Sequence, residues 1–308
     1  MKEEYFTATG RCAVKTQTGL VLALKYHLSD NERLTEQMLR KLLRDNKNKL
    51  NTGFVGTPLL CNVLTEHGMT DLAYRLLLNE EYPGWLHEVK LGATTVWERW
   101  NSLDENGRIS STGMNSLNHY SYGAVLEWIF RHVAGIDVTE QGPGGKMMRI
   151  SPKVDHKLGS ASAVYDSASG CYRCGWQIAN GDQITVTVTV PFGAKAQVIL
   201  PYAPDSVYHD TDNPLFETVE NGICCVKAGQ YTVTYKAASP LKKSYSVDST
   251  LEDLLAEPAI RAFLSNMMEV DMIPDLAYGL TLRQAAEAFA GGVSAEQAQR
   301  LNVLLEEF

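Results

Sequence analysis

The sequence has 308 residues, enough for about two domains of ordinary size. Its hydrophobic fraction of 44% and charged fraction of 21% are ordinary for a globular protein, and no apolar run approaches the roughly 20 residues that cross a membrane. The net charge of −8 comes without a basic stripe, which argues against nucleic acid as a partner.

Residues 1–136 show the periodicity of helices joined by short loops. A leucine recurs at four-residue spacing from Leu20 to Leu28, after a segment at Thr16 that can begin a helix. Thr57 is the predicted N-cap of a later helix, with Pro58 in its first turn. Other amphipathic helices are predicted over residues 34–43, 72–77 and 122–133, the last closed by Gly135.

Helices that follow one another without strands are typical of an α/α barrel or toroid. The helices of residues 1–136 would make about half of such a barrel, and an open half would expose an apolar edge to water. We therefore expect a missing N-terminal half of the barrel, or another chain, to complete it. Self-association into a homo-oligomer is one way to cover that edge.

Residues 137–245 change to a period of two. Residues 183–190 alternate strictly, with isoleucine and valines on one face and mostly threonines on the other. Asn180-Gly181 and Asn221-Gly222 are signals for hairpin turns. This pattern predicts an antiparallel β-sandwich.

Residues 246–308 return to the helical period. Ser249 or Thr250 can cap the first helix, Pro258 would kink or split it, and Ser294 with Gln297 forms a capping box. Residues 251–308 hold ten acidic and three basic side chains, so most of the negative charge lies here. We interpret this segment as an acidic helical extension for packing or docking. The near-neutral remainder fits an uncharged substrate.

The six cysteines do not resemble the disulfide framework of a secreted protein. Cys171 and Cys174 lie at an odd spacing in a predicted strand, which sends their side chains to opposite faces. A metal site shared with Cys224 and Cys225 is conceivable, but reduced, mostly buried thiols are the preferred interpretation. We expect no metal, no cofactor and, because the N-terminus does not resemble a signal peptide, a cytoplasmic protein.

Two loop-proximal clusters carry residues suited to carbohydrate chemistry. The first, GATTVWERW at residues 92–100, has Trp97 and Trp100 flanking Glu98. Indole faces pack on sugar C–H groups, and a carboxylate can act on water or on a sugar oxygen. The second, MNSLNHYSYG at residues 114–123, places Asn118 and His119 just before a helix, where they can bond sugar hydroxyls.

Each cluster also has a purely structural interpretation. The first can be a buried aromatic patch with a surface pair between Glu98 and Arg99. His119 can be a capping or core histidine. Ser102 and Asp104 make no hydrolase triad, because no nucleophile elbow of the type G-x-S-x-G occurs.

These clusters and several other stretches resemble the bacterial α-L-rhamnosidases of glycoside hydrolase family 78. The resemblance covers most of the first 136 residues, and residues 150–152 and 165–167 resemble the C-terminal sandwich of that family. Within residues 1–136, the stretches that match the family are TQTG at 16–19, TGFVGTPLL at 52–60, DLAY at 71–74, YPGW at 82–85, the two clusters above, and residues 123–132 with Gly135.

The resemblance implies an (α/α)6 barrel that hydrolyses terminal α-L-rhamnose from glycosides with inversion of configuration. It implies that Glu98 is the general base and that His119 lines the rhamnose pocket, with Trp97, Trp100 and Asn118 shaping or contacting the sugar site. The family's general acid lies upstream, and no stretch here matches it. Because an inverting reaction needs both carboxyl groups, we expect the chain alone to be inactive.

Two other functions remain open at this point. The chain can be a non-catalytic carbohydrate-binding or assembly module, in which Glu98 has no catalytic role. It can also belong to a different glycosidase or lyase with a helical barrel. A lyase acting on uronic acids favours a basic site, which the near-neutral first 250 residues do not indicate.

Overall fold

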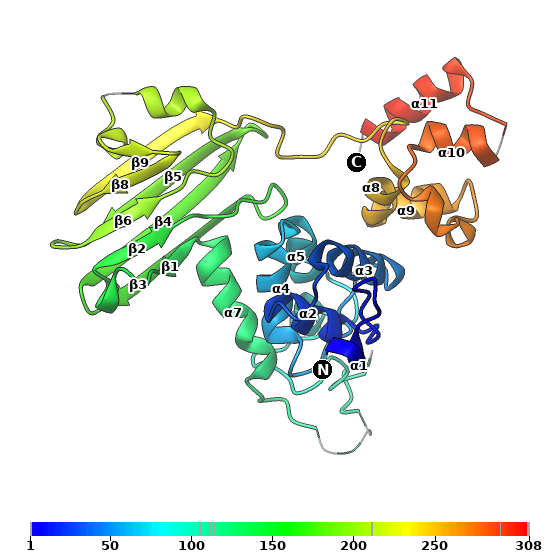
Figure 1. Cartoon of the computed structure of the whole chain (residues 1–308), viewed down its shortest axis with the longest axis horizontal. Helices are drawn as coiled ribbons and strands as arrows, with labels where there is room; N and C mark the ends of the chain where they lie inside the picture. Colours follow the sequence, from blue (N-terminus) through cyan, green and yellow to red (C-terminus); the bar gives the residue numbers. More distant parts are fainter. Residues whose placement is uncertain are drawn as a thin grey trace. The chain divides into compact units, whose positions relative to one another are not determined.

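The computed structural model describes residues 2–104, 106–110, 113, 115–210, 212–289 and 291–306. The chain divides into two units, residues 1–241 and residues 242–308. The first unit contains a helical region followed by two β-sheets (Figure 1). No helix within the described ranges is long and apolar enough to span a membrane.

The helical region consists of short helices that pack on one another. Thr16 caps α2 by accepting a hydrogen bond from the Gly19 amide, and the buried Leu20 and Leu24 face the core, as predicted. Helix α2 packs on α3 and α4, and α4 packs on α5. The bounds are α1 Lys2–Tyr5, α2 Gln17–Lys25, α3 Glu32–Asp45, α4 Thr57–Glu66, α5 Thr70–Leu77 and α6 Trp85–Lys90.

The predicted N-cap of α4 was wrong by one residue. Gly56 occupies the cap position, and Thr57 is the first helical residue. The Thr57 hydroxyl lies 2.8 Å from the hydroxyl of Thr52, and both residues are buried. Because the cap residue is glycine, the helix begins without a side-chain cap.

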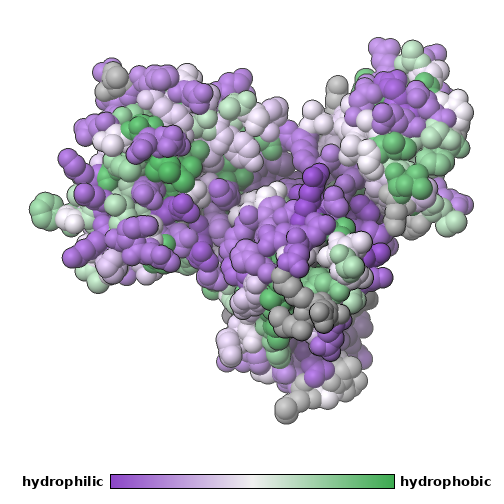
Figure 2. Space-filling view, in the orientation of Figure 1, coloured by the Kyte–Doolittle hydropathy of each residue, from purple (hydrophilic) through white to green (hydrophobic). Residues whose placement is uncertain are grey.

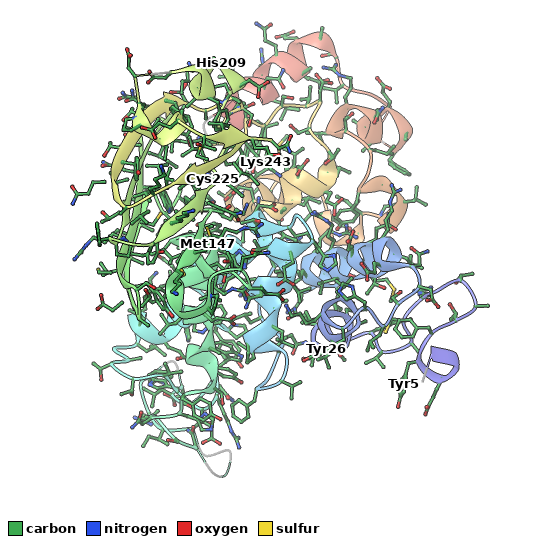
Figure 3. The ribbon with its side chains drawn as sticks, turned by 60° about the vertical axis from the view of Figure 1, so that its left-hand side comes forward. Tyr5, Tyr26, Met147, His209, Cys225 and Lys243 are labelled. Carbon is green, nitrogen blue, oxygen red and sulfur yellow. The ribbon has the colours of Figure 1, made fainter. Side chains whose placement is uncertain are left out.

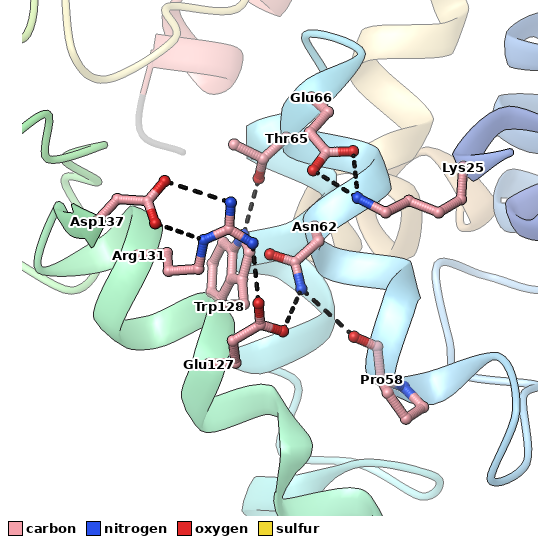
Figure 4. A network of polar contacts seen from close by, with 9 residues as sticks. All are labelled: Lys25, Pro58, Asn62, Thr65, Glu66, Glu127, Trp128, Arg131 and Asp137. Carbon is pink, nitrogen blue, oxygen red and sulfur yellow. Dashed lines mark hydrogen bonds and ion pairs between the residues drawn. The ribbon is translucent and has the colours of Figure 1, made fainter. Parts of the chain in front are cut away.

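The last helical segment changes its winding along its length. It runs from the 3-10 turn η1 Ser121–Ala124 through α7 Val125–Trp128 into the π-helical η2 Ile129–Val133. A polar network joins it to its neighbours (Figure 4). Glu127 accepts from Asn62 of α4, and Arg131 bonds both Glu127 and Asp137 of the first strand.

Gly135 closes this segment, as predicted, and joins the helices to the sheets. Its φ of 81° is in the left-handed region, and a Cβ there would lie 2.2 Å from the Pro152 backbone nitrogen. Its carbonyl accepts from the Ser151 amide at 2.8 Å. Only glycine allows this close approach of the two backbones.

The two sheets form the sandwich predicted for the middle of the chain. One sheet has the strand order β1-β2-β6-β8-β7 and the other β3-β4-β5-β9. Among the described strands all pairs are antiparallel except β2 with β6, which is parallel. The bounds are β1 Ile136–Val138, β2 Met147–Ile150, β3 Ser160–Ser167, β4 Gly170–Ala179, β5 Gln183–Val190, β6 Lys195–Val198, β7 Val219–Glu220, β8 Ile223–Val226 and β9 Gly229–Lys236.

The predicted alternation and turns are present. Ile184, Val186, Val188 and Val190 of β5 are buried, and the hairpins β4–β5 and β7–β8 turn at Asn–Gly pairs with positive φ. The sheets face each other through Tyr172 of β4, whose single hydroxyl proton lies between the carbonyls of Gly145 and Lys195, 2.8 and 2.9 Å from the hydroxyl oxygen. Because Lys195 begins β6, the central strand of the other sheet, this contact joins the two sheets.

The helices and the sheets of the first unit share one hydrophobic core. Trp176 of β4 donates to the Val133 carbonyl at 2.7 Å, and Tyr74 of α5 donates to the Lys153 carbonyl. The division of the chain into domains at residues 1–136, 137–245 and 246–308 stays a prediction.

The second unit is helical and has its own core around Leu254, Ile260 and Leu305. Thr250 caps α8, α9 begins at Pro258, and Ser294 exchanges capping bonds with Gln297, as predicted. Figure 2 shows hydrophobic residues, in green, at the surface of this unit. Met272 and Leu276 are among its exposed hydrophobic side chains. The bounds are α8 Leu251–Ala256, α9 Pro258–Ser265, η6 Val270–Met272, η7 Asp275–Ala277, α10 Leu282–Phe289 and α11 Ala295–Glu306.

Candidate functional site

The two clusters singled out in the sequence lie side by side. The Glu98 amide donates to the Ser116 carbonyl at 2.9 Å, and the His119 amide donates to the Val96 carbonyl at 2.8 Å. The Thr95 hydroxyl donates to the Leu117 carbonyl. These bonds hold residues 95–98 and 116–119 as a backbone ladder that brings Glu98 near His119. Met114, at the start of the second cluster, is outside the described residues.

The ring of His119 is held in place by its neighbours, and one of its two nitrogens accepts a hydrogen bond. Its ring stacks on Phe54 with centroids 4.7 Å apart and planes at 9°. Its Nδ1 accepts from the Ser121 amide at 3.4 Å. In the neutral ring the proton is therefore on Nε2, which can donate to a ligand hydroxyl. The ring is half-buried, and the neighbouring Asn118 is exposed.

Trp97 and Trp100 lie in the core, 3% and 8% exposed. The Trp100 ring stacks on Tyr122 with centroids 4.0 Å apart, and its Nε1 donates to the Thr52 carbonyl at 3.1 Å. Trp85 of α6 meets Trp100 edge-on and donates to the Tyr122 carbonyl. The observed placement of the indoles is thus the buried aromatic patch of the structural interpretation, and their contact with a sugar stays a prediction.

Glu98 is half-buried, and its charge affects a nearby tyrosine. The pKa of the Tyr122 hydroxyl is raised, first by burial and then by the negative charge of Glu88, with Glu98 adding to it and Arg99 opposing it. The carboxyl groups of Glu88 and Glu98 therefore both lie close enough to Tyr122 to raise the pKa of its hydroxyl.

Glu88 was missed by sequence reasoning. It is 4% exposed on α6, and burial raises the pKa of its carboxyl to about 8. Its Oε1 accepts or donates no hydrogen bond among the residues that the structure describes. The available signal was its position three residues after Trp85, which places both side chains on one helix face.

Ser102 joins the two clusters through hydrogen bonds. Its hydroxyl donates to Asn115 Oδ1 at 2.6 Å and accepts from the Arg99 amide, while the Asn115 amide donates back to the Ser102 carbonyl. The side chain is fully buried. This agrees with the expectation that Ser102 is no hydrolytic nucleophile.

The cysteines are free thiols with mixed exposure. Cys174 is buried and Cys171 half-buried on β4, and Cys224 is buried next to Cys225 on β8. Cys225 is exposed and is labelled in Figure 3. Burial raises the pKa of Cys174 to about 12 and that of Cys224 to about 11, which favours their thiol forms. Within the described part of the chain, no three histidine, cysteine or acidic side chains are grouped to hold a metal.

Family comparisons match two consecutive parts of the chain. Residues 1–133 match the bacterial alpha-L-rhamnosidase 6 hairpin glycosidase domain, and residues 135–213 match the bacterial alpha-L-rhamnosidase C-terminal domain. An α-L-rhamnosidase of Alteromonas sp. is 39% identical over 221 residues, which are 70% of this chain and 23% of the relative. One of Formosa agariphila is 39% identical over 208 residues, 67% of this chain and 22% of the relative.

Solved structures give the same result. The α-L-rhamnosidase of Streptomyces avermitilis, complexed with L-rhamnose, superposes with a TM-score of 0.68 at 33% identity, covering 76% of this chain and 23% of that one. The enzyme of Aspergillus terreus gives a TM-score of 0.66 at 29% identity, covering 78% of this chain and 26% of that one. The chain thus spans about a quarter of the length of these relatives.

Proposed function

Since this chain belongs to the bacterial α-L-rhamnosidase family, we propose that it carries the general base of an inverting hydrolysis of terminal α-L-rhamnosides. In this proposal Glu98 is the base. The observation that carries it is the ladder between residues 95–98 and 116–119, which holds Glu98 beside the half-buried His119 at the surface of the helical region.

The chemistry needs one proton to be taken up and one to be delivered. Ionised Glu98 takes a proton from a water molecule whose oxygen bonds to the anomeric carbon of rhamnose. The glycosidic C–O bond breaks, and a general acid protonates the departing oxygen. An inverting pair of carboxyl groups stands about 6.5–9.5 Å apart to leave space for that water.

The polar neighbours of Glu98 hold the sugar. His119 donates from Nε2 to a rhamnose hydroxyl, with its ring fixed by Phe54 and by the Ser121 amide. The exposed Asn118 offers an amide to a second hydroxyl. Trp97 and Trp100 shape the site from inside, because their burial fixes the backbone on both sides of Glu98.

The general acid is proposed to come from outside these 308 residues. None of the stretches that resemble the family includes it, and this chain matches less than a quarter of the length of each of these relatives. The remaining part of the barrel, on a longer chain or on a partner, would supply the acid and the other wall of the site. The substrate is then a rhamnose-containing glycoside or oligosaccharide.

The test is a chimera. Residues 1–213 of this chain replace the matching segment of the Streptomyces avermitilis enzyme, and release of p-nitrophenol from its α-L-rhamnoside is measured beside the isolated chain. We expect turnover by the chimera and a rate for the isolated chain lower by a factor of at least about 10²–10⁴, the usual contribution of an acid or base. Comparable turnover by the isolated chain would refute the incomplete site.

A folded but inactive chimera would instead refute the proposal for Glu98 and its neighbours. Folding is checked by thermal unfolding and by binding of L-rhamnose, the sugar present in the Streptomyces avermitilis structure.

A further inference from the structure

Ser102 is a fully buried serine whose hydroxyl makes two hydrogen bonds with opposite roles. The hydroxyl donates to Asn115 Oδ1 at 2.6 Å and accepts from the Arg99 amide at 3.1 Å. The side-chain amide of Asn115 donates back to the Ser102 carbonyl at 2.9 Å. Because the hydroxyl proton points to Asn115, the hydroxyl oxygen is left to accept from Arg99, and each hydrogen bond depends on the other.

The hydrogen bond from Arg99 holds one of the two peptide units that flank Glu98. The Arg99 amide belongs to the peptide after the Cα of Glu98, and it donates to Ser102 Oγ. The Glu98 amide belongs to the peptide before that Cα, and it donates to the Ser116 carbonyl at 2.9 Å. Each peptide unit is planar, so the orientations of these two units set φ and ψ at Glu98 and, with them, the direction of its Cα–Cβ bond.

The two acceptors, Ser116 and Ser102, are joined to each other. Ser116 directly follows Asn115 in the chain, and Asn115 accepts from Ser102. A ring of contacts therefore closes around the Cα of Glu98. It passes from the Glu98 amide to the Ser116 carbonyl and along the chain to Asn115. From Asn115 it returns through Ser102 Oγ to the Arg99 amide.

We propose that Ser102 and Asn115 are positioning residues for Glu98, which together direct its carboxyl toward the attacking water. The inference rests on the proposed function, because it takes Glu98 as the general base. A base must come within about 2.6–3.2 Å of the group that loses the proton, and a displacement of about 1 Å can lower a rate by about 10²-fold. Without the Ser102 hydroxyl, the peptide after Glu98 is free to rotate and to carry the carboxyl away from the water.

The first measurement reads this peptide and needs no enzymatic activity. The whole chain is labelled with ¹⁵N in its arginines, the Arg99 amide is assigned with an Arg99→Lys variant, and hydrogen exchange is followed by NMR. In the wild-type chain the hydrogen bond to Ser102 should protect this amide. In Ser102→Ala its exchange should be faster by about tenfold or more, because the acceptor is gone. Asn115→Ala should also speed the exchange, since the Ser102 hydroxyl is then free to turn.

The matched control is Thr65→Val. The Thr65 hydroxyl on α4 accepts from Trp128 Nε1 at 2.8 Å, so the variant removes a hydrogen bond from the same helical region without touching the ring of contacts around Glu98 (Figure 4). We expect the Arg99 amide of Thr65→Val to exchange at the wild-type rate. The comparison separates the loss of the Ser102 acceptor from a general loosening of the fold.

The second measurement is the kinetics of the chimera that tests the proposed function. Ser102→Ala should lower its kcat on p-nitrophenyl α-L-rhamnoside by about 10- to 10²-fold and change KM by less than about twofold, because the sugar still binds while the base is misplaced. The double variant with Asn115→Ala should lose about as much as the larger single variant, since both residues act through one ring of contacts. Thr65→Val should keep the kcat of the parent chimera.

Two results would overturn the proposal. One is an Arg99 amide that exchanges in Ser102→Ala as it does in the wild-type chain, and the other is a folded Ser102→Ala chimera with the kcat of its parent. If Ser102→Ala does not fold, Asn115→Ala decides both points. A folded but inactive parent chimera refutes the proposed function itself, whereas an active parent with an unaffected Ser102→Ala variant refutes only the positioning role.

Discussion

The ring of His119 lies parallel to the ring of Phe54, with centroids 4.7 Å apart and planes at 9°. Phe54 comes from the loop before α4 and also touches Tyr122, so it links His119 to the buried aromatic patch. The orientation of His119 therefore depends on a residue 65 positions earlier in the chain.

Replacing Phe54 should weaken sugar binding in the active chimera. Stacked aromatic pairs contribute about 0.5–1.5 kcal/mol beyond burial, which corresponds to a rise in KM of roughly 2- to 10-fold for Phe54→Ala. The matched control is Phe192→Ala, which removes a 97% exposed ring from the loop between β5 and β6. An unchanged KM for Phe54→Ala would mean that the Phe54 ring does not hold His119 for the substrate.

Trp100 should matter for stability. Trp100→Phe keeps a ring against Tyr122 but leaves the buried Thr52 carbonyl without its donor, at a cost of about 1–3 kcal/mol. Trp100→Ala should lower the free energy of unfolding by about 3–5 kcal/mol. Urea unfolding of the chain measures both. If Trp100→Phe leaves stability unchanged and instead weakens L-rhamnose binding, the indole is a sugar contact.

Gly135→Ala should be strongly destabilising, because backbone strain at a left-handed φ adds to the steric overlap of the new Cβ. The left-handed φ of 81° disfavours a side chain, and the new Cβ would meet the Pro152 backbone nitrogen. We expect a loss above about 2 kcal/mol in urea unfolding. Gly68→Ala is the control: its φ is 71° with no atom within 4 Å of the added Cβ, so only strain of about 1 kcal/mol remains. Equal losses would contradict the close approach at Gly135.

His132 should make the chain less stable in acid. Burial, and then the charge of Arg131, lower its pKa to about 4, below its ordinary value of 6.5. As pH falls, the unfolded chain therefore takes up this proton first. The free energy of unfolding should fall between about pH 6.5 and about pH 4, by up to about 3 kcal/mol. In His132→Gln the slope over that window should be smaller, and an unchanged slope would show that other groups cause it.

Local sequence patterns predicted the helices and strands, but they did not predict all of the strand pairing. The alternation over residues 183–190 and the Asn–Gly turns act within one hairpin, and β4, β5 and their turn follow from them. The parallel pairing of β2 with β6 joins segments about fifty residues apart, and the alternation of a short strand is the same for either direction. Similarly, Thr57 fits the preference for an N-cap, but it is the first helical residue of α4 and its hydroxyl contacts Thr52.

Sequence motifs singled out the two clusters of the candidate site. The positions of side chains that depend on burial in the fold could not be predicted in this way. GATTVWERW and the segment around His119 singled out the two clusters, but the hydrogen bonds that join them were not predicted. The placement of Trp100 depends on Tyr122, which the sequence pattern alone does not position. Glu88 carries no motif, and its burial depends on how the chain packs around α6.

The measurement that tests the central claim most directly is the kcat/KM of the chimera with Glu98→Gln on p-nitrophenyl α-L-rhamnoside. Glutamine keeps the shape of the side chain and cannot take a proton from water. We predict a fall of about 10²–10⁴-fold, mainly in kcat, with thermal unfolding unchanged and Glu140→Gln as the silent control. A Glu98→Gln chimera as active as its parent would contradict the account.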